Sequence, residues 1–231
     1  MRDPRPRTIE DVETPLSRSE VRRYLGYPGD VAPQHQVDEL LEHWMQEAVR
    51  CARPRAIYMV LPVATLDQHR VCLQTPAGIR ELRGSVGKFL AGSRYVAAFI
   101  ATAGSEIDRL AGDLGRSGKA LEAMVVAAVG AERAEAAEYA VIEQLNERAE
   151  PGGLATTLPY SPGYCGMVLT EQTGLFALFG DDTVGVTLSS ECVMTPLRSV
   201  SGLIGIGPSH EIEDQARPCD RCELVGCNMR R

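Results

Sequence analysis

The C-terminal tail of the chain carries three cysteines at the spacing of metal ligands. Cys219, Cys222 and Cys227 form the pattern C-x2-C-x4-C. The two-residue gap lets two thiolates bind one centre from a tight turn, and the third thiolate follows closely in the sequence. Because few apolar residues surround these cysteines, packing in a core does not explain them. The spacing predicts a metal or cluster site, and a flexible tail with reducible thiols is the alternative.

Two kinds of centre fit these cysteines. A [4Fe–4S] cluster would take its fourth ligand from Cys192, from Cys165, from a substrate or from solvent. A zinc ion would take His210 as its fourth ligand. We interpret residues 210–231, which would hold either centre, as a cysteine-bearing tail added to the rest of the chain.

A turn flanked by two tyrosines is the second candidate site. Pro162 fixes φ and Gly163 permits a positive φ, so the backbone must reverse sharply between the tyrosines. The tyrosine rings and hydroxyls can face one concave surface just before a helix, where a small polar ligand could be held. A plain helix-entry turn is the alternative. The candidate ligand-binding residues are Tyr160, Ser161, Pro162, Gly163, Tyr164 and Cys165.

Composition narrows the classes of partner. The 231 residues are 44% hydrophobic and 24% charged, which is typical of a globular protein. The net charge of −7 argues against nucleic acid as a partner, because phosphate binding needs a basic surface. The segment 1–6 lacks the apolar core of a secretory signal, and the longest apolar run, 123–131, is too short to span a bilayer. We therefore expect a cytoplasmic protein with no membrane partner.

The periodicity of apolar residues and the positions of turn-forming residues predict the secondary structure. We expect an extended N-terminal arm over 1–16 and one domain over 17–209, opened by a capping box at Ser17 and Glu20. Strands and helices are mixed rather than strictly alternating, which predicts an α+β fold with a mainly antiparallel sheet flanked by helices. Expected helices span 17–24, 33–53, 82–90, 105–114, 120–148 and 170–179, and expected strands span 55–63, 71–74, 95–102, 183–189 and 200–206.

Several blocks of the sequence resemble one known family in the same order. The turn is similar to the Arg-Pro-Ala-Pro-Gly-Tyr-Pro loop of the activation domain of vitamin-B12-dependent methionine synthase, and closer to the Ser-Pro-Gly-Tyr loop of its stand-alone relatives. The resemblance runs from about Thr8 to Ser209. The other blocks are Tyr24-Leu25-Gly26-Tyr27, Tyr95 to Gly104, Met194-Thr195-Pro196 and Ser199-Val200-Ser201-Gly202.

The resemblance implies a function in cobalamin chemistry. Domains of this family bind S-adenosylmethionine and present it to cobalamin carried by a neighbouring domain, while a flavodoxin-type donor supplies an electron. By analogy, this chain would be a reactivation module for a corrinoid-dependent methyltransferase in methionine synthesis. Its partners would be that methyltransferase and a flavodoxin- or ferredoxin-type electron donor.

The resemblance also carries over individual residues. Tyr164 matches the tyrosine of the family loop, and Glu135 matches a helix carboxylate that holds ribose hydroxyls. Two positions depart from the pattern, since Pro159 replaces an arginine and Gly26 replaces an aspartate. Arg198 is the candidate replacement for the lost cation.

Two other functions are consistent with the same residues. The departures at 159 and 26, together with the cysteine tail, also fit an iron–sulfur electron-transfer protein that has lost S-adenosylmethionine binding. A zinc-stabilised binding module without a redox role is the third interpretation. The nature of the bound metal distinguishes all three.

Overall fold

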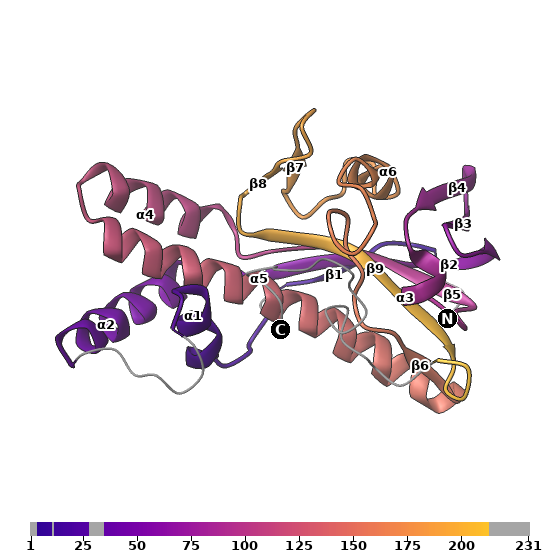
Figure 1. Ribbon diagram of the computed structural model, residues 1–231, viewed down its shortest axis with the longest axis horizontal. Coiled ribbons are helices and arrows are strands. Elements are labelled where there is room, and N and C mark those ends of the chain that lie inside the picture. Colours follow the sequence, from indigo (N-terminus) through magenta and orange to yellow (C-terminus); the bar gives the residue numbers. More distant parts are fainter. Residues whose placement is uncertain (1–3, 11, 28–34, 213–231) are drawn as a thin grey trace.

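The computed structural model describes residues 4–10, 12–27 and 35–212. Its centre is a seven-stranded antiparallel sheet in the order β4-β3-β2-β5-β9-β6, with β1 paired to β2 (Figure 1). Two short strands form a separate ribbon, β7 (Thr187–Leu188) with β8 (Met194–Thr195). The strands of the main sheet are β1 (Arg7–Ile9), β2 (Arg55–Leu66), β3 (Arg70–Thr75), β4 (Gly78–Arg83), β5 (Tyr95–Thr102), β6 (Leu154–Thr156) and β9 (Ser199–Pro208).

The helices cover the sheet and extend beyond one end of it. The long helix α5 (Ala120–Ala149) runs along one face, and its N-terminal half packs with α1, α2 and α4 beside the sheet (Figure 1). A short helix, α6, packs on the opposite face. The other helices are α1 (Arg18–Tyr24), α2 (His35–Cys51), α3 (Val86–Phe89), α4 (Ser105–Arg116), α6 (Glu171–Phe176) and a 3-10 turn at Glu150–Gly152. The predicted α+β class is confirmed.

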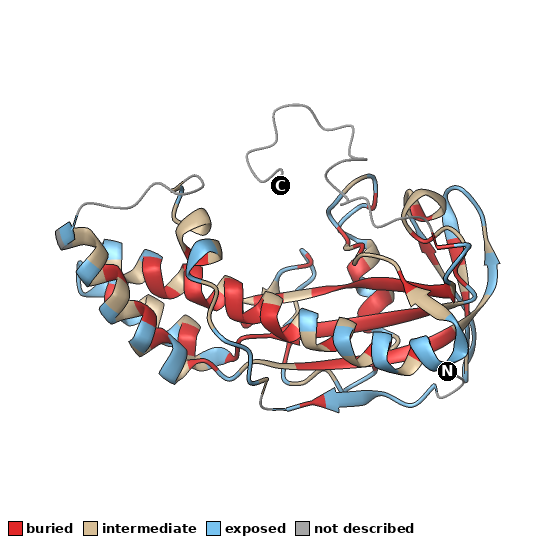
Figure 2. Ribbon diagram, turned by 90° about the horizontal axis from the view of Figure 1, so that it is seen from below, coloured by how far each residue is buried: buried red, intermediate tan, exposed pale blue. Residues whose placement is uncertain are grey.

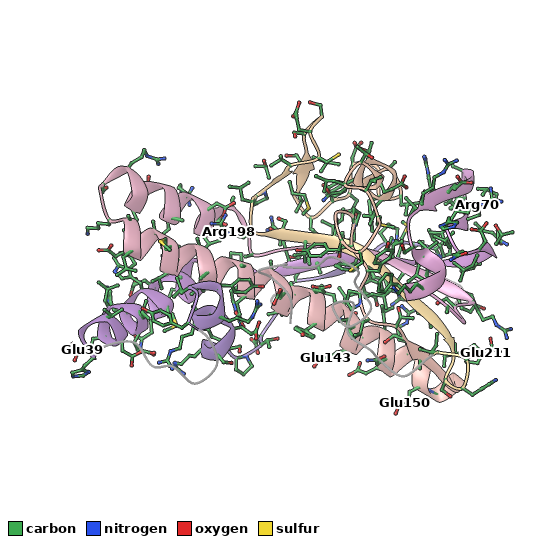
Figure 3. All side chains as sticks on the ribbon, viewed as in Figure 1. Glu39, Arg70, Glu143, Glu150, Arg198 and Glu211 are labelled. Atoms are coloured by element: carbon green, nitrogen blue, oxygen red, sulfur yellow. The ribbon has the colours of Figure 1, made fainter. Side chains whose placement is uncertain are left out.

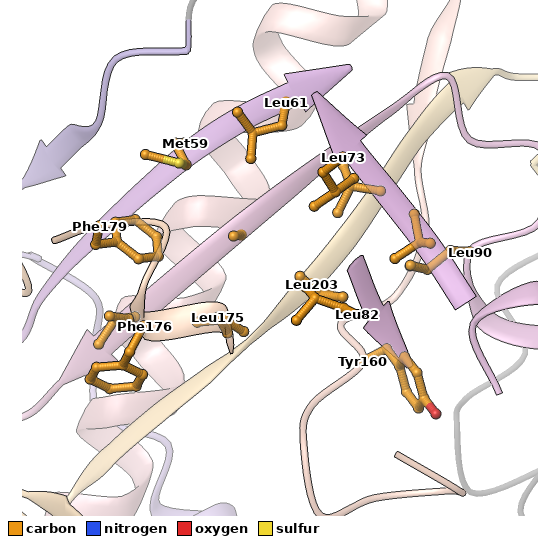
Figure 4. Packing of buried hydrophobic residues seen from close by; sticks show 14 of the residues in the cluster. Met59, Leu61, Leu73, Leu82, Leu90, Tyr160, Leu175, Phe176, Phe179 and Leu203 are labelled. Carbon is orange, nitrogen blue, oxygen red and sulfur yellow. The ribbon is translucent and has the colours of Figure 1, made fainter. Parts of the chain in front are cut away.

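Successive side chains of the central strands point to opposite faces of the sheet, so an apolar core lies on each face. Ile57 and Met59 of β2 face α6, whereas Ala56 and Tyr58 face α5. Both faces are buried, as the red central strands in Figure 2 show. Figure 4 shows the aliphatic and aromatic packing on the α6 side. Each such buried side chain contributes roughly 1.5–3 kcal/mol of hydrophobic free energy, so the middle of the sheet is a rigid support for the loops on it.

Most of the predicted elements are confirmed, and the helix cap at Ser17 is half of a capping box. The predicted strand 95–102 coincides with β5, and the predicted strand 71–74 lies within β3, which pairs with β2. Ser17 Oγ accepts the backbone N–H of Glu20 at 3.4 Å. The Glu20 carboxylate does not complete the box, because it binds Arg23 instead.

Three predicted elements need correction. The helix predicted over 82–90 is wrong, because the hairpin that follows β3 draws Leu82 into the sheet and leaves only Val86–Phe89 helical. The helix predicted over 170–179 is confined to Glu171–Phe176, and Thr170 is itself helical, with no side-chain capping bond. The strand predicted over 183–189 is reduced to Thr187–Leu188. For Leu82, pairing with Val71 of β3 overrides the local helical pattern.

The N-terminal arm is joined to the domain by a buried ion pair. Glu132 and Arg133, both on α5, contact each other at 2.6 Å and are almost fully buried. Arg133 donates to the carbonyls of Thr14 and Pro15, and Glu132 accepts the backbone N–H of Ser17. The arm then supplies β1 to the sheet, so it is an integral part of the domain.

Candidate functional site

The predicted sharp turn at Pro162 and Gly163 is confirmed. The Tyr164 backbone N–H donates to the Ser161 carbonyl at 3.2 Å, and Gly163 has φ of 89°. Proline in the second position and a positive φ in the third define a type II turn. A second pair of backbone bonds links Met167 to Gly163 and Tyr164, each at 2.9 Å. Backbone hydrogen bonds within residues 161–167 therefore fix the segment that carries Tyr164.

Tyr160 anchors this turn from inside the protein. Its side chain is 1% exposed, and its backbone exchanges two hydrogen bonds with Leu203 of β9 (Figure 4). Its hydroxyl accepts the Ser85 backbone N–H at 2.9 Å and donates to the Cys165 carbonyl at 3.2 Å. The ring stacks on Phe89, with 4.5 Å between centroids. The prediction that the Tyr160 ring faces a concave surface together with Tyr164 is wrong, because the backbone of Tyr160 pairs with β9 and its ring is buried in the core.

Burial further stabilises the neutral form of the Tyr160 phenol. Loss of solvent raises its pKa above the usual value for tyrosine, and the hydrogen bond from Ser85 opposes this rise only in part. A neutral phenol can both donate and accept, which the bridge between Ser85 and Cys165 requires.

Tyr164 and Cys165 occupy the two sides of the turn. Tyr164 is 60% exposed, so its ring is open to a ligand or partner. Cys165 has φ of 45° and is partly buried against the apolar cluster under α6. Gly166 follows, and a Cβ there would lie 2.5 Å from Ser85 Oγ. The turn thus packs tightly against the segment between β4 and α3, with Tyr164 pointing outward.

Glu135 lies on α5 against α1. Its carboxylate accepts a hydrogen bond from the hydroxyl of Tyr24, the first residue of the Tyr24–Tyr27 block. Gly26, with φ of 86°, ends α1. The N–H of Tyr27 donates to the carbonyl of Arg22 and that of Gly26 to Arg23, which is the Schellman pattern. Position 26 therefore has a backbone reason to be glycine.

Arg198 lies elsewhere, where β9 begins beside α5 (Figure 3). Its Nε donates to the Ala127 carbonyl at 3.2 Å, and its Nη1 is 3.7 Å from a carboxylate oxygen of Asp108 on α4. The structure thus places the predicted residues in three groups: the turn, Glu135 with Tyr24, and Arg198 with Asp108. Sequence reasoning missed Asp108, since no motif connects a residue in α4 with the start of β9.

The predicted metal ligands Cys219, Cys222 and Cys227 lie outside the described residues. Of the proposed fourth ligands, Cys192 is buried with its sulfur 3.7 Å from Thr173 Oγ1, and His210 is exposed beside Glu211. Within residues 4–10, 12–27 and 35–212, no group of three or more His, Cys, Asp or Glu side chains could hold a metal ion.

Comparisons with known proteins give a likeness at the level of structure. No protein-family model matches the chain, and no curated protein matches it. Among the helices that the structure describes, none is long and apolar enough to cross a membrane. The chain matches a solved structure, "Crystal Structure of the MetH Reactivation Domain bound to AdoHcy", with a TM-score of 0.63 and 16% identity over 92% of this chain and 81% of the other. The chain therefore has the fold of the MetH reactivation domain.

Proposed function

We propose that this protein is a cytoplasmic reactivation module for a cobalamin-dependent methyltransferase of methionine synthesis. The observation that carries the proposal is the match of fold with a reactivation domain over 92% of this chain. The neighbour is bound to AdoHcy, which makes S-adenosylmethionine the ligand to test here. The motif order from the Tyr24 block to the Ser199 block supports the same assignment.

The turn and α5 would hold the ligand. Tyr164 offers an exposed aromatic face for the nucleoside, on a backbone that Ser161, Pro162 and Gly163 keep rigid. Cys165 lines the inner side of that turn. Glu135 offers a carboxylate beside the Tyr24 hydroxyl, and a carboxylate is a group that can accept ribose hydroxyls.

Tyr160 would support the turn from behind, whereas Arg198 belongs to a separate group beside Asp108. Tyr160 orients the turn through Ser85 and Cys165 without facing the ligand. Arg198 supplies a cation at the start of β9. The partner's cobalamin would supply the methyl acceptor once a flavodoxin- or ferredoxin-type donor has reduced it, and the role of this chain is to bind and orient the methyl donor.

Calorimetric titration with S-adenosylmethionine and with AdoHcy tests this proposal. We expect saturable binding by the full chain, at least tenfold weaker binding by Tyr164→Ala, and unchanged binding by the equally exposed control Val168→Ala. Pro159→Arg, which restores the family residue, should strengthen binding. Equal affinity of Tyr164→Ala and the parent protein would remove the turn from the site.

The cysteine tail favours a second candidate function, electron transfer through an iron–sulfur cluster. The spacing of Cys219, Cys222 and Cys227 motivates it. Anaerobic purification followed by iron, sulfide and zinc analysis distinguishes the two centres, and zinc without iron would support a zinc-stabilised module instead. Each Cys→Ser substitution should release the metal, since two thiolates alone cannot compete with solvent. Neither metal in the full chain would eliminate both metal-dependent functions.

A truncation that tests the tail must retain residues up to 212. Ile212 is buried against Gly207, and Glu211 forms an ion pair with Arg94 at 2.6 Å. A chain that ends after Ile212 should keep the melting transition of the full protein. Reactivation of the partner by this truncated chain at the full rate would exclude the cysteines from the mechanism.

A further inference from the structure

The hairpin of α4 and α5, which extends beyond one end of the sheet, has an exposed apolar surface (Figure 1). Met124 of α5 is 56% exposed, and Leu121, one turn before it, is also exposed. Beside Met124 lies an open depression of about 350 Å³ between the two helices. A protruding apolar side chain next to a hollow on the same surface suits a symmetric contact between two copies of one chain. The small residues that line the depression are Ala111, Gly112, Ala123 and Ala127.

The exposed side of α4 carries charges with a symmetric spacing and alternating sign. Four charged residues, separated by three, four and three positions, lie on one side of the helix: Glu106, Arg109, Asp113 and Arg116. Their spacing is symmetric about Ala111, and the sign of the charge reverses across that centre. When two copies of α4 pack antiparallel about Ala111, Arg109 therefore faces Asp113 of the partner subunit. Arg116 likewise faces Glu106 of the partner subunit, so every charge in the pattern meets an opposite one.

These charges can change partners without disturbing the fold of one chain. Arg109 is exposed, and it has no ion pair within the part of the chain that the structure describes. Asp113 and Arg116 form an ion pair along the helix, but both side chains stay largely exposed, and such a pair contributes little to stability. The remaining charge of α4, Asp108, accepts the backbone N–H of Leu197 in its own chain and is not part of the pattern.

We propose that the exposed face of α4 and the N-terminal part of α5 binds a second copy of this chain, forming a two-fold symmetric dimer. Ala111 and Met124 line the same depression, so Met124 lies close to the two-fold axis. Met124 of each chain then enters the depression of the other, and the charges of α4 form the rim of the contact. This dimer does not depend on the proposed reactivation function, because none of its residues is proposed to bind the methyl donor.

Sedimentation velocity of the full chain over a range of concentrations tests the dimer. A reductant is present, so that no disulfide links two chains. We expect a reversible equilibrium with a dissociation constant on the order of 10 µM, because a contact between two helical hairpins is smaller than a standard interface. Salt should weaken the dimer, since the charges on its rim are exposed to solvent. A folded chain that stays monomeric about tenfold above this concentration would overturn the proposal.

Two charge-reversed variants test the antiparallel pairing. Arg109→Glu places acidic residues opposite each other in the dimer and Asp113→Arg places basic ones, so each variant alone should dimerise at least tenfold more weakly. An equimolar mixture of the two should restore the dimer, because every altered residue then faces an opposite charge. Arg80→Glu, at an exposed position on β4, changes the net charge as Arg109→Glu does and should leave the equilibrium unchanged.

The mixture distinguishes contact between chains from effects within one chain. An effect confined to one chain would persist in the mixture, so a mixture that dimerises no better than the separate variants would contradict the pairing. Dimerisation of Arg109→Glu and Asp113→Arg at the strength of the parent protein would rule out this face of α4.

A third pair of variants tests the apolar centre. Met124→Asp should weaken the dimer at least tenfold, whereas Ile79→Asp, at a similarly exposed position on β4, should not change it. Tyr164→Ala should also leave the dimer intact, which separates this surface from the proposed nucleoside site. A dimer of parental strength in Met124→Asp, with its melting temperature retained, would place the interface elsewhere.

Discussion

The hydroxyl of Tyr160 accepts the backbone N–H of Ser85 across 2.9 Å, and this contact ties the tyrosine turn to the segment between β4 and α3. The same hydroxyl donates to the Cys165 carbonyl, so one buried side chain holds both ends of the turn. The outward position of Tyr164 depends on this anchor.

Replacing Tyr160 with phenylalanine should destabilise the protein without removing its ring stacking. The Ser85 N–H and the Cys165 carbonyl would lose their shared partner, and an unsatisfied buried polar group costs about 1–3 kcal/mol. Urea unfolding measures this loss. Tyr139→Phe, at an exposed position on α5, is the control and should change stability by less than about 0.5 kcal/mol. Equal stability of the two variants would mean that the hydroxyl bridge is not formed.

Stability at alkaline pH should report the same phenol. Burial raises the pKa of Tyr160 in the folded protein, whereas in the unfolded chain the phenol titrates at about 10. The native state therefore keeps a proton that the unfolded state releases. Its contribution is complete below about pH 10 and is lost as the pH rises through the native pKa. The difference in unfolding free energy between the parent and Tyr160→Phe should shrink over that window, and a constant difference would contradict the assignment.

The sequence predicts the turn and the secondary-structure elements with clear local signals. It does not predict which residues far apart in the sequence come into contact. The apolar β5 run and the Pro162-Gly163 pair are local signals, and both are confirmed. The placement of Leu82 in a strand depends on pairing with β3, which local periodicity does not encode. The burial of Tyr160 and the meeting of Asp108 with Arg198 depend on tertiary packing in the same way. The roles of the predicted ligand residues stay predictions.

Introducing a side chain at Gly163 should strain the type II turn. Its φ of 89° is unfavourable for alanine, and the added methyl would lie 3.5 Å from Leu169 Cδ1, so the cost comes from the backbone rather than from a clash. We expect Gly163→Ala to lower stability by about 1–2 kcal/mol and to weaken AdoHcy binding. Gly152→Ala, where φ is not positive and only Leu154 is close, is the control. Unaltered stability and binding in Gly163→Ala would show that the turn adapts freely.

Removing the cation of the buried ion pair on α5 should lower the stability of the protein far more than removing the cation of an exposed ion pair. Arg133→Leu leaves the Glu132 carboxylate buried and frees the carbonyls of Thr14 and Pro15, with an expected cost of about 3–5 kcal/mol. Arg116→Leu removes an exposed partner of Asp113 and should cost less than about 1 kcal/mol. Thermal unfolding compares the two. Similar melting temperatures would indicate that the arm contributes little to the domain.

We propose that this protein supports reactivation of a cobalamin-dependent methyltransferase. The most direct measurement adds the full chain to a methionine synthase that lacks its own reactivation domain and holds cob(II)alamin, under anaerobic conditions with S-adenosylmethionine and reduced flavodoxin. The formation of methylcobalamin is followed by visible absorbance. We predict that the chain increases its rate at least tenfold and that Tyr164→Ala removes most of that increase. The same rate with and without the correctly folded chain would contradict the account.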